Sequence, residues 1–204
     1  MKSQKSKVKS QNHNSNVSKL AKSYKSLVLG KDEEIFLPII WRGEVDLIDL
    51  NVELKGDGSS IKILGLLVGK KQERVDIKIN LSHVGQNTKS EIIFKGALED
   101  ESEVNFEGLV RINKNAKKTN AWLAVHLLLL SDKANGRAIP SLEILENDIK
   151  AGHATTVGKV NDLEMFYLQS RGLSKEKAKQ LIVEGFLKSV LEEMPEEVRL
   201  KIKD

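Results

Sequence analysis

Alternating hydrophobic and polar residues dominate the chain from residue 41 to about 130. Hydrophobic side chains recur at every second position, which is the period of a half-buried strand, and turn-forming Gly, Asn and Asp residues separate the segments. The pattern predicts strands at 61–68, 75–81, 91–97, 104–112 and 121–130, with shorter ones between 45 and 54. Proline is absent from residues 39–139, so each of these strands can occupy a central position in a sheet.

The predicted strands are evenly spaced. Their centres recur at roughly 13–18 residues, which fits a repeating all-β architecture better than alternating strands and helices. Two arrangements satisfy the pattern, an antiparallel β-sandwich and a β-helix of stacked coils. Aliphatic residues, which stack well inside coils, outnumber aromatic residues. The pattern alone leaves both arrangements open.

The C-terminal quarter has a different character. Residues 142–145 and Ile149 are predicted to form short strands, and 162–171 a helix capped by Asn161 or Asp162. A longer helix is expected from Ser174 to Met194, followed by a third piece that starts at Pro195. The predicted buried stripe of the longer helix comprises Ala178, Leu181, Ile182, Phe186, Val190 and Leu191. The predicted division is a disordered basic tail (1–30), a β core (31–160) and a helical subdomain (161–204).

The positive charge of the chain is concentrated in its N-terminal tail. Residues 1–25 hold seven lysines and no acidic residue, whereas the remainder has 26 basic and 29 acidic residues. Such a tail neutralises phosphates weakly. It lacks stacking aromatic residues apart from Tyr24, so a nucleic-acid partner is not expected.

Cysteine is absent from the sequence, which excludes disulfides, thiolate metal sites and cysteine nucleophiles. No signal peptide is visible, and the longest apolar run, 121–130, is interrupted by His126. A bilayer span needs about 20 apolar residues. We therefore expect a soluble, cytoplasmic protein without a membrane partner.

Three histidines lie within the predicted folded region. His153 follows a glycine and precedes small residues, so its imidazole is accessible as a ligand for iron or zinc. The alternative is a histidine that only hydrogen-bonds a turn. His83 is predicted to be structural, at a coil corner, and His126 to be a hydrogen-bonded core residue.

The segment 142–172 resembles the C-terminal signature of the SufB/SufD family, the scaffold proteins of SUF iron–sulfur cluster assembly. The family runs LEI-x-x-DD-x-K-C-x-HGATVG and FYLxSRG align with Leu142-Glu143-Ile144, Asp148, Lys150, His153-Ala154-Thr155, Val157-Gly158, Phe166-Tyr167-Leu168 and Ser170-Arg171-Gly172. The match covers about residues 43–190. The resemblance implies a mainly β protein, with a right-handed parallel β-helix core and a C-terminal α-helical subdomain.

The resemblance also implies a site. The histidine of this motif is implicated in cluster assembly where SufB and SufD meet, so His153 is the candidate iron or cluster ligand. The family's cysteine positions hold Ala151 and Leu168 here, so a partner must supply the sulfur. We therefore expect a SufD-like, non-catalytic scaffold subunit. It would bind no cofactor stably alone, although an iron–sulfur cluster could form transiently in the complex.

Two partners follow from the same resemblance. A SufB-like subunit, or a second copy, is expected at the terminal β strands near 143–157. A SufC-like ABC ATPase is expected on the C-terminal helices, contacting Phe166, Tyr167, Arg171 and Phe186. The alternative is that Phe166 and Phe186 only pack the helices together. Two other functions stay open: a β-helix carbohydrate-active enzyme, and a stand-alone homo-oligomeric scaffold.

Overall fold

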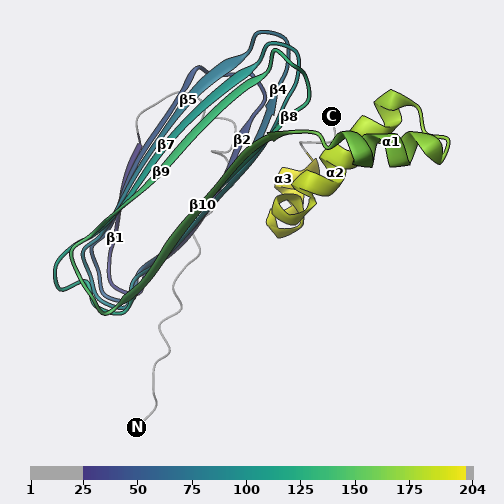
Figure 1. Cartoon of the computed structure of the whole chain (residues 1–204). Helices are drawn as coiled ribbons and strands as arrows, with labels where there is room; N and C mark the ends of the chain where they lie inside the picture. Colours follow the sequence, from purple (N-terminus) through teal and green to yellow (C-terminus); the bar gives the residue numbers. More distant parts are fainter. Residues whose placement is uncertain (1–24, 201–204) are drawn as a thin grey trace.

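The computed structural model describes residues 25–200, which form ten strands followed by three helices (Figure 1). The strands are β1 (Lys25–Leu29), β2 (Glu34–Trp41), β3 (Leu47–Leu54), β4 (Ser60–Gly69), β5 (Arg74–His83), β6 (Lys89–Leu98), β7 (Glu103–Ile112), β8 (Thr119–Leu129), β9 (Asn135–Ile144) and β10 (Ile149–Lys159). The helices are α1 (Asp162–Ser170), α2 (Lys175–Glu193) and α3 (Glu196–Leu200).

Successive strands alternate between two parallel sheets. Sheet A has the order β1-β3-β5-β7-β9, and sheet B the order β10-β8-β6-β4-β2. Each strand pairs in parallel with the strand two places along the chain, so the backbone winds as a β-solenoid of about five turns. The predicted parallel β-helix is confirmed. The β-sandwich is wrong, because its strands would pair antiparallel.

The solenoid is filled by every second residue of each strand. Inner positions of neighbouring coils stack in register, as Ile63 on Ile92 and Val75 on Val104 do. Phe94 of sheet B meets Phe106 of sheet A across the interior, with ring centroids 5.0 Å apart. Gly65 makes room for Phe94, because a Cβ at that position would lie 2.0 Å from the ring. The alternation read from the sequence is therefore the alternation between interior and surface.

The coil corners are built from turns that repeat from coil to coil. Lys71 and Asp100 hold equivalent places in successive coils, with φ values of 53° and 56°. The Lys71 amide donates to Asp100 Oδ2 at 2.9 Å, and the Glu101 amide donates to the Lys71 carbonyl. The corners thus contribute hydrogen bonds along the stack, in addition to those of the sheets.

A buried polar group lies inside one row of corners. His83 is fully buried, with Nδ1 2.8 Å from Thr88 Oγ1 and Nε2 2.9 Å from Ser90 Oγ. Thr88 in turn contacts Thr119 of the next coil at 3.0 Å. Burial lowers the pKa of His83 to about 4, so the ring is neutral at pH 7. The predicted structural role of His83 at a coil corner agrees with this position.

Helices α2 and α3 pack on the outer face of sheet B, and α1 packs against α2. Ser174 caps the N-terminus of α2, and its hydroxyl accepts from the Lys177 amide; Asn161 caps α1 in the same way, accepting from the Leu163 amide. A second apolar cluster joins the helices to the sheet and comprises Leu64, Leu66, Ala97, Leu187, Val190, Met194 and Val198. The predicted stripe is wrong at Leu181, which is 47% exposed, because Leu187 lies on the buried face instead.

The prolines inside strands lie only at sheet edges. Pro38 is in β2 and Pro140 in β9, and within the part of the chain that the structure describes each of these strands has one paired side. An edge strand tolerates a residue that lacks an amide donor. Strand β9 therefore runs through Pro140 rather than starting after it, and β10 extends well beyond Ile149.

The predicted tail, 1–30, overlaps the fold. Its last residues form β1, the first strand of sheet A, and Lys25 pairs with Leu50. The prediction of disorder for residues 1–24 lies outside the described residues, as does that part of the helical subdomain beyond residue 200. The β core thus begins at the strand that precedes its predicted start.

Acid should destabilise the solenoid through His83. Its pKa is about 4 when folded and about 6.5 when unfolded, so its contribution is complete above pH 6.5 and falls as the pH drops toward 4. Between pH 7.5 and 4.5 the expected loss is about 2.5 kcal/mol in the free energy of unfolding. Urea titrations between pH 7.5 and 4.5 should show it. The His83→Gln variant, less stable at every pH, should lose less over this interval, and equal losses would contradict the assignment.

A methyl group at position 65 should be poorly tolerated. Gly65→Ala would force Phe94 or a strand to move, at an expected cost of about 1–3 kcal/mol. Gly158→Ala in β10 is the matched control, because nothing lies within 4 Å of a Cβ built there. Thermal unfolding of both variants, followed by circular dichroism, measures the difference. Equal melting temperatures would disprove the close approach.

Candidate functional site

The candidate ligand His153 lies on β10, the last strand of sheet B. It is in register with Leu123, a core residue of β8, so its side chain belongs to the inner row of the solenoid. No further coil covers that row within the described residues, and His153 is exposed. Its neighbour Ala151 packs against the core. The structure therefore presents one imidazole at the end of the coil stack, on a backbone held by β8.

The last coil is an open end. Among residues 25–200, strands β9 and β10 each have a paired neighbour on one side only, which leaves a row of backbone donors and acceptors along the other side. Large apolar side chains surround this end and are between 39% and 54% exposed: Ile139, Ile144, Leu145 and Val157. We call the uncovered inner row and these four residues the open end. Unpaired strand edges beside apolar side chains are typical of a surface that receives another chain.

His153 alone cannot complete a metal site. Within residues 25–200, no group of three or more His, Cys, Asp or Glu residues is placed to hold a metal ion. One imidazole supplies one ligand, and iron and zinc sites need several. The arrangement can contribute a nitrogen ligand to a site that a second chain completes.

Three of the four predicted partner-binding residues lie together on exposed surface. Phe166 and Tyr167 of α1 are 70% and 55% exposed, and the Arg171 guanidinium lies 5.2 Å from the Tyr167 ring centroid. Sequence reasoning missed Leu163 and Leu181, which are exposed on the same pair of helices. Helix α1 has no buried residue. We call Leu163, Phe166, Tyr167 and Leu181 the helical ridge.

The fourth predicted residue, Phe186, has a different environment. It is half-buried where α2 meets sheet B, and Lys95 Nζ lies 4.9 Å from its ring centroid. The same ammonium donates to the Phe186 carbonyl at 2.7 Å. Burial lowers the pKa of Lys95. Phe186 therefore packs α2 against sheet B, whereas the alternative in the sequence had Phe166 and Phe186 packing the helices against each other.

His126 does not lie in the core as the sequence predicted. It faces outward from sheet B, half-buried, because its neighbours Val125 and Leu127 occupy the inner row. Its Nδ1 is 2.8 Å from Thr156 Oγ1 of β10. Burial, together with the nearby Lys95 charge, lowers the pKa of His126. This contact fastens β10 to β8 three residues beyond His153.

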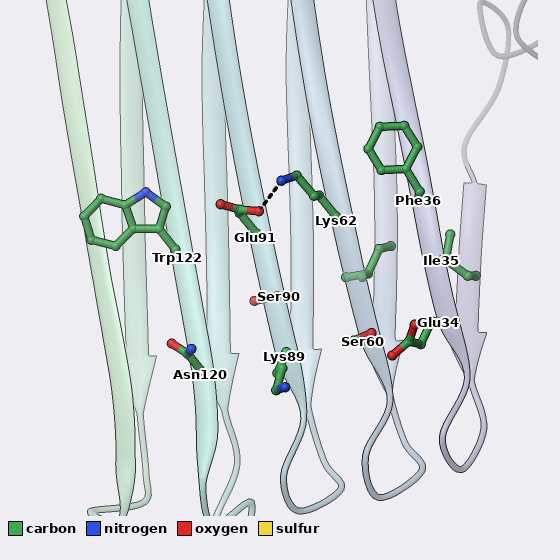
Figure 2. Close-up of a pocket in the computed structure, with 11 residues that line it drawn as sticks. Glu34, Ile35, Phe36, Ser60, Lys62, Lys89, Ser90, Glu91, Asn120 and Trp122 are labelled. Atoms are coloured by element: carbon green, nitrogen blue, oxygen red, sulfur yellow. Dashed lines mark ion pairs between the residues drawn. The ribbon is translucent and has the colours of Figure 1, made fainter. Parts of the chain in front are cut away.

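A shallow depression on the outer face of sheet B also offers space for a ligand. Figure 2 shows Phe36 and Trp122 on opposite sides of it, with Lys62 and Glu91 between them. Lys62 Nζ lies 2.7 Å from Glu91 Oε2 and also pairs with Glu193 at the end of α2. The pKa of Lys62 is raised, most by its hydrogen bond to Glu193 and next by its hydrogen bond to Glu91. The centre of the depression is thus occupied by an ion pair that fastens a helix.

Comparisons with known proteins agree with the geometry. The family model described as "SUF system FeS cluster assembly, SufBD core domain" matches residues 2–186. The iron–sulfur cluster assembly protein SufD of Bacillus subtilis is 35% identical over 167 residues, which is 81% of this chain and 38% of that protein.

Two further relatives show the same partial overlap. The SufBD family protein PH1385 of Pyrococcus horikoshii is 35% identical over 178 residues, or 87% of this chain and 36% of its own length. SufB of Bacillus subtilis is 30% identical over 149 residues, which is 73% of this chain and 32% of that protein. The chain therefore spans well under half the length of the curated relatives it matches.

Among the helices of residues 25–200, none is long and apolar enough to cross a membrane.

Proposed function

The chain belongs to the SufBD core family of the SUF iron–sulfur cluster assembly system, and we propose that it acts there as a non-catalytic, SufD-like scaffold subunit. In this proposal the open end pairs with a SufB-like subunit, and the helical ridge docks a SufC-like ABC ATPase. His153 contributes a ligand to iron or to a nascent cluster at the first of these interfaces.

The observation that carries the proposal is the uncovered inner row of the last coil. Interior coils of the solenoid cover their apolar rows with the next coil, whereas the row that contains Ala151 and His153 has no such cover in the described residues. A strand from another chain can supply both the cover and the missing backbone hydrogen bonds. His153 would then lie inside the interface rather than beside it.

The absence of cysteine assigns the sulfur to the partner. Iron–sulfur clusters are held mainly by thiolates, and the sequence has none to offer. A neutral imidazole is a suitable additional ligand for iron. The cluster is then cargo that forms between two chains, and neither chain needs to hold it alone.

The helical ridge supports the second interface. Four large apolar side chains on α1 and α2 are exposed, and Arg171 beside Tyr167 can form a bidentate pair with a carboxylate. Aromatic and arginine residues are enriched where protein interfaces bind most strongly. An ATPase that docks here would meet an element anchored to sheet B through Lys95 and Phe186.

The structure gives the carbohydrate-active alternative little support. Glycoside hydrolysis needs two carboxyl groups that face one bond. The depression of sheet B is lined by two carboxylates, Glu34 and Glu91, and Lys62 pairs with Glu91, so the two do not form a free acid–nucleophile pair.

Replacement of His153 should separate assembly of the complex from assembly of the cluster. The full chain is co-purified with the SufB-like and SufC-like proteins of the same genome, with His153→Ala and, as control, Thr155→Ala from the same inner row. We expect both variants to keep the complex. Only His153→Ala should slow cluster formation, by at least about tenfold, measured by iron content and visible absorbance. Failure of the wild-type chain to associate with either protein would refute the proposed function.

Replacement of the ridge should affect the ATPase alone. Phe166→Ala is expected to weaken binding of the SufC-like protein by at least about tenfold, because it removes a large exposed aromatic side chain from the proposed contact. Val84→Ala, which removes part of a 41% exposed side chain at a coil corner, is the control. Isothermal titration calorimetry measures both. Unchanged ATPase binding by Phe166→Ala would move the docking site elsewhere.

A further inference from the structure

Trp122 packs over the strand that carries His153. It lies on β8 and faces outward, because its neighbours Ala121 and Leu123 are in the core. Its indole covers Gly152 of β10: a Cβ at Gly152 would lie 2.6 Å from Trp122 Cζ3 and 3.0 Å from Cε3. A side chain at position 152 would displace the ring. The missing side chain of Gly152 therefore lets the indole reach the last strand of sheet B.

The indole is left partly exposed at that strand. Trp122 is 43% exposed, although tryptophan is among the most costly side chains to leave in water. The outward positions of β10 on either side of Gly152 are Lys150 and Ala154, and only the lysine is large. A strand placed about 4.8 Å beyond β10 would bring its own outward side chain next to the indole.

We propose that Trp122 is an anchor residue of the interface with the SufB-like subunit. The partner's added strand extends sheet B beyond β10, and an apolar side chain on its outer face packs against the indole across Gly152. This inference rests on the proposed function, and it adds a contact on the outer face to the one that His153 makes from the inner row. Buried tryptophans near an interface centre commonly dominate its affinity.

The chain offers a matched control on the same face. Phe36, Lys62, Glu91 and Trp122 lie in one register row across sheet B, and Phe36 is 39% exposed on β2, at the opposite edge. Both aromatic residues border the same depression (Figure 2). They differ in which end of the solenoid they adjoin, so only Trp122 should respond to a partner at the open end.

The sequence also provides a direct spectroscopic test. It has two tryptophans, and the other, Trp41, is fully buried with its indole N–H donated to the Val45 carbonyl at 2.7 Å. The chain is labelled with 5-fluorotryptophan and titrated with the unlabelled SufB-like protein. The ¹⁹F resonance that Trp122→Phe removes should shift on binding, and the Trp41 resonance should stay in place.

Affinity measurements complete the test. Trp122→Ala should weaken binding of the SufB-like protein by at least about tenfold, and Gly152→Ala should weaken it by displacing the ring. Phe36→Ala should change it by less than about twofold. Circular dichroism of each variant verifies the fold.

Three results would overturn the inference. In the first, the wild-type chain binds the SufB-like protein without a shift of the Trp122 resonance, and Trp122→Ala binds it with wild-type affinity. That result would exclude this contact and leave the proposed function intact. Absence of any wild-type complex removes both. A Trp122 shift that grows with the concentration of the chain alone would assign the surface to a second copy instead.

Discussion

Each strand of this protein depends on the strand of the neighbouring coil for its backbone hydrogen bonds and for the cover over its apolar row. Interior coils receive both from two sides, and the end coils from one. The two ends meet this constraint differently. The inner row of the N-terminal end has Leu29 and Trp41 fully buried, although Val28 and Phe36 on its outer faces are exposed. In the inner row of the C-terminal end Ile144, Val157 and His153 are exposed. The inner row where β9 and β10 end the stack therefore still has apolar surface that a further strand could bury.

The fold was largely predictable because one physical pattern repeats in every coil. Alternation located the strands, and Gly, Asn and Asp located the corners, since left-handed backbone there favours those residues. Whether the coils stack or form a sandwich was not in the pattern, because both bury every second residue. The path of β9 through Pro140 depends on that strand being at an edge, which is a property of the whole sheet.

The candidate site was less predictable for the same reason. The resemblance identified His153, but its exposure follows from the absence of a covering coil among the described residues. The choice between Leu181 and Leu187 depends on how α2 rotates over sheet B. The role of Trp122 could not be predicted from its neighbours in the sequence. Its indole covers Gly152, which is thirty residues away in the sequence and becomes adjacent only when the coils stack.

The helices extend the same dependence to a second surface. Polar contacts hold α2 to the solenoid along its length: Lys179 to the corner residue Glu99, Lys95 to the Phe186 carbonyl, and Glu193 to Lys62. Helix α1 has no buried residue and carries most of the helical ridge. A partner bound to the ridge would therefore be connected through α2 to β4 and β6 in the middle of sheet B. Because β10 is the edge of that same sheet, both proposed partners would act on one continuous hydrogen-bonded layer, joined to β10 through His126 and Thr156.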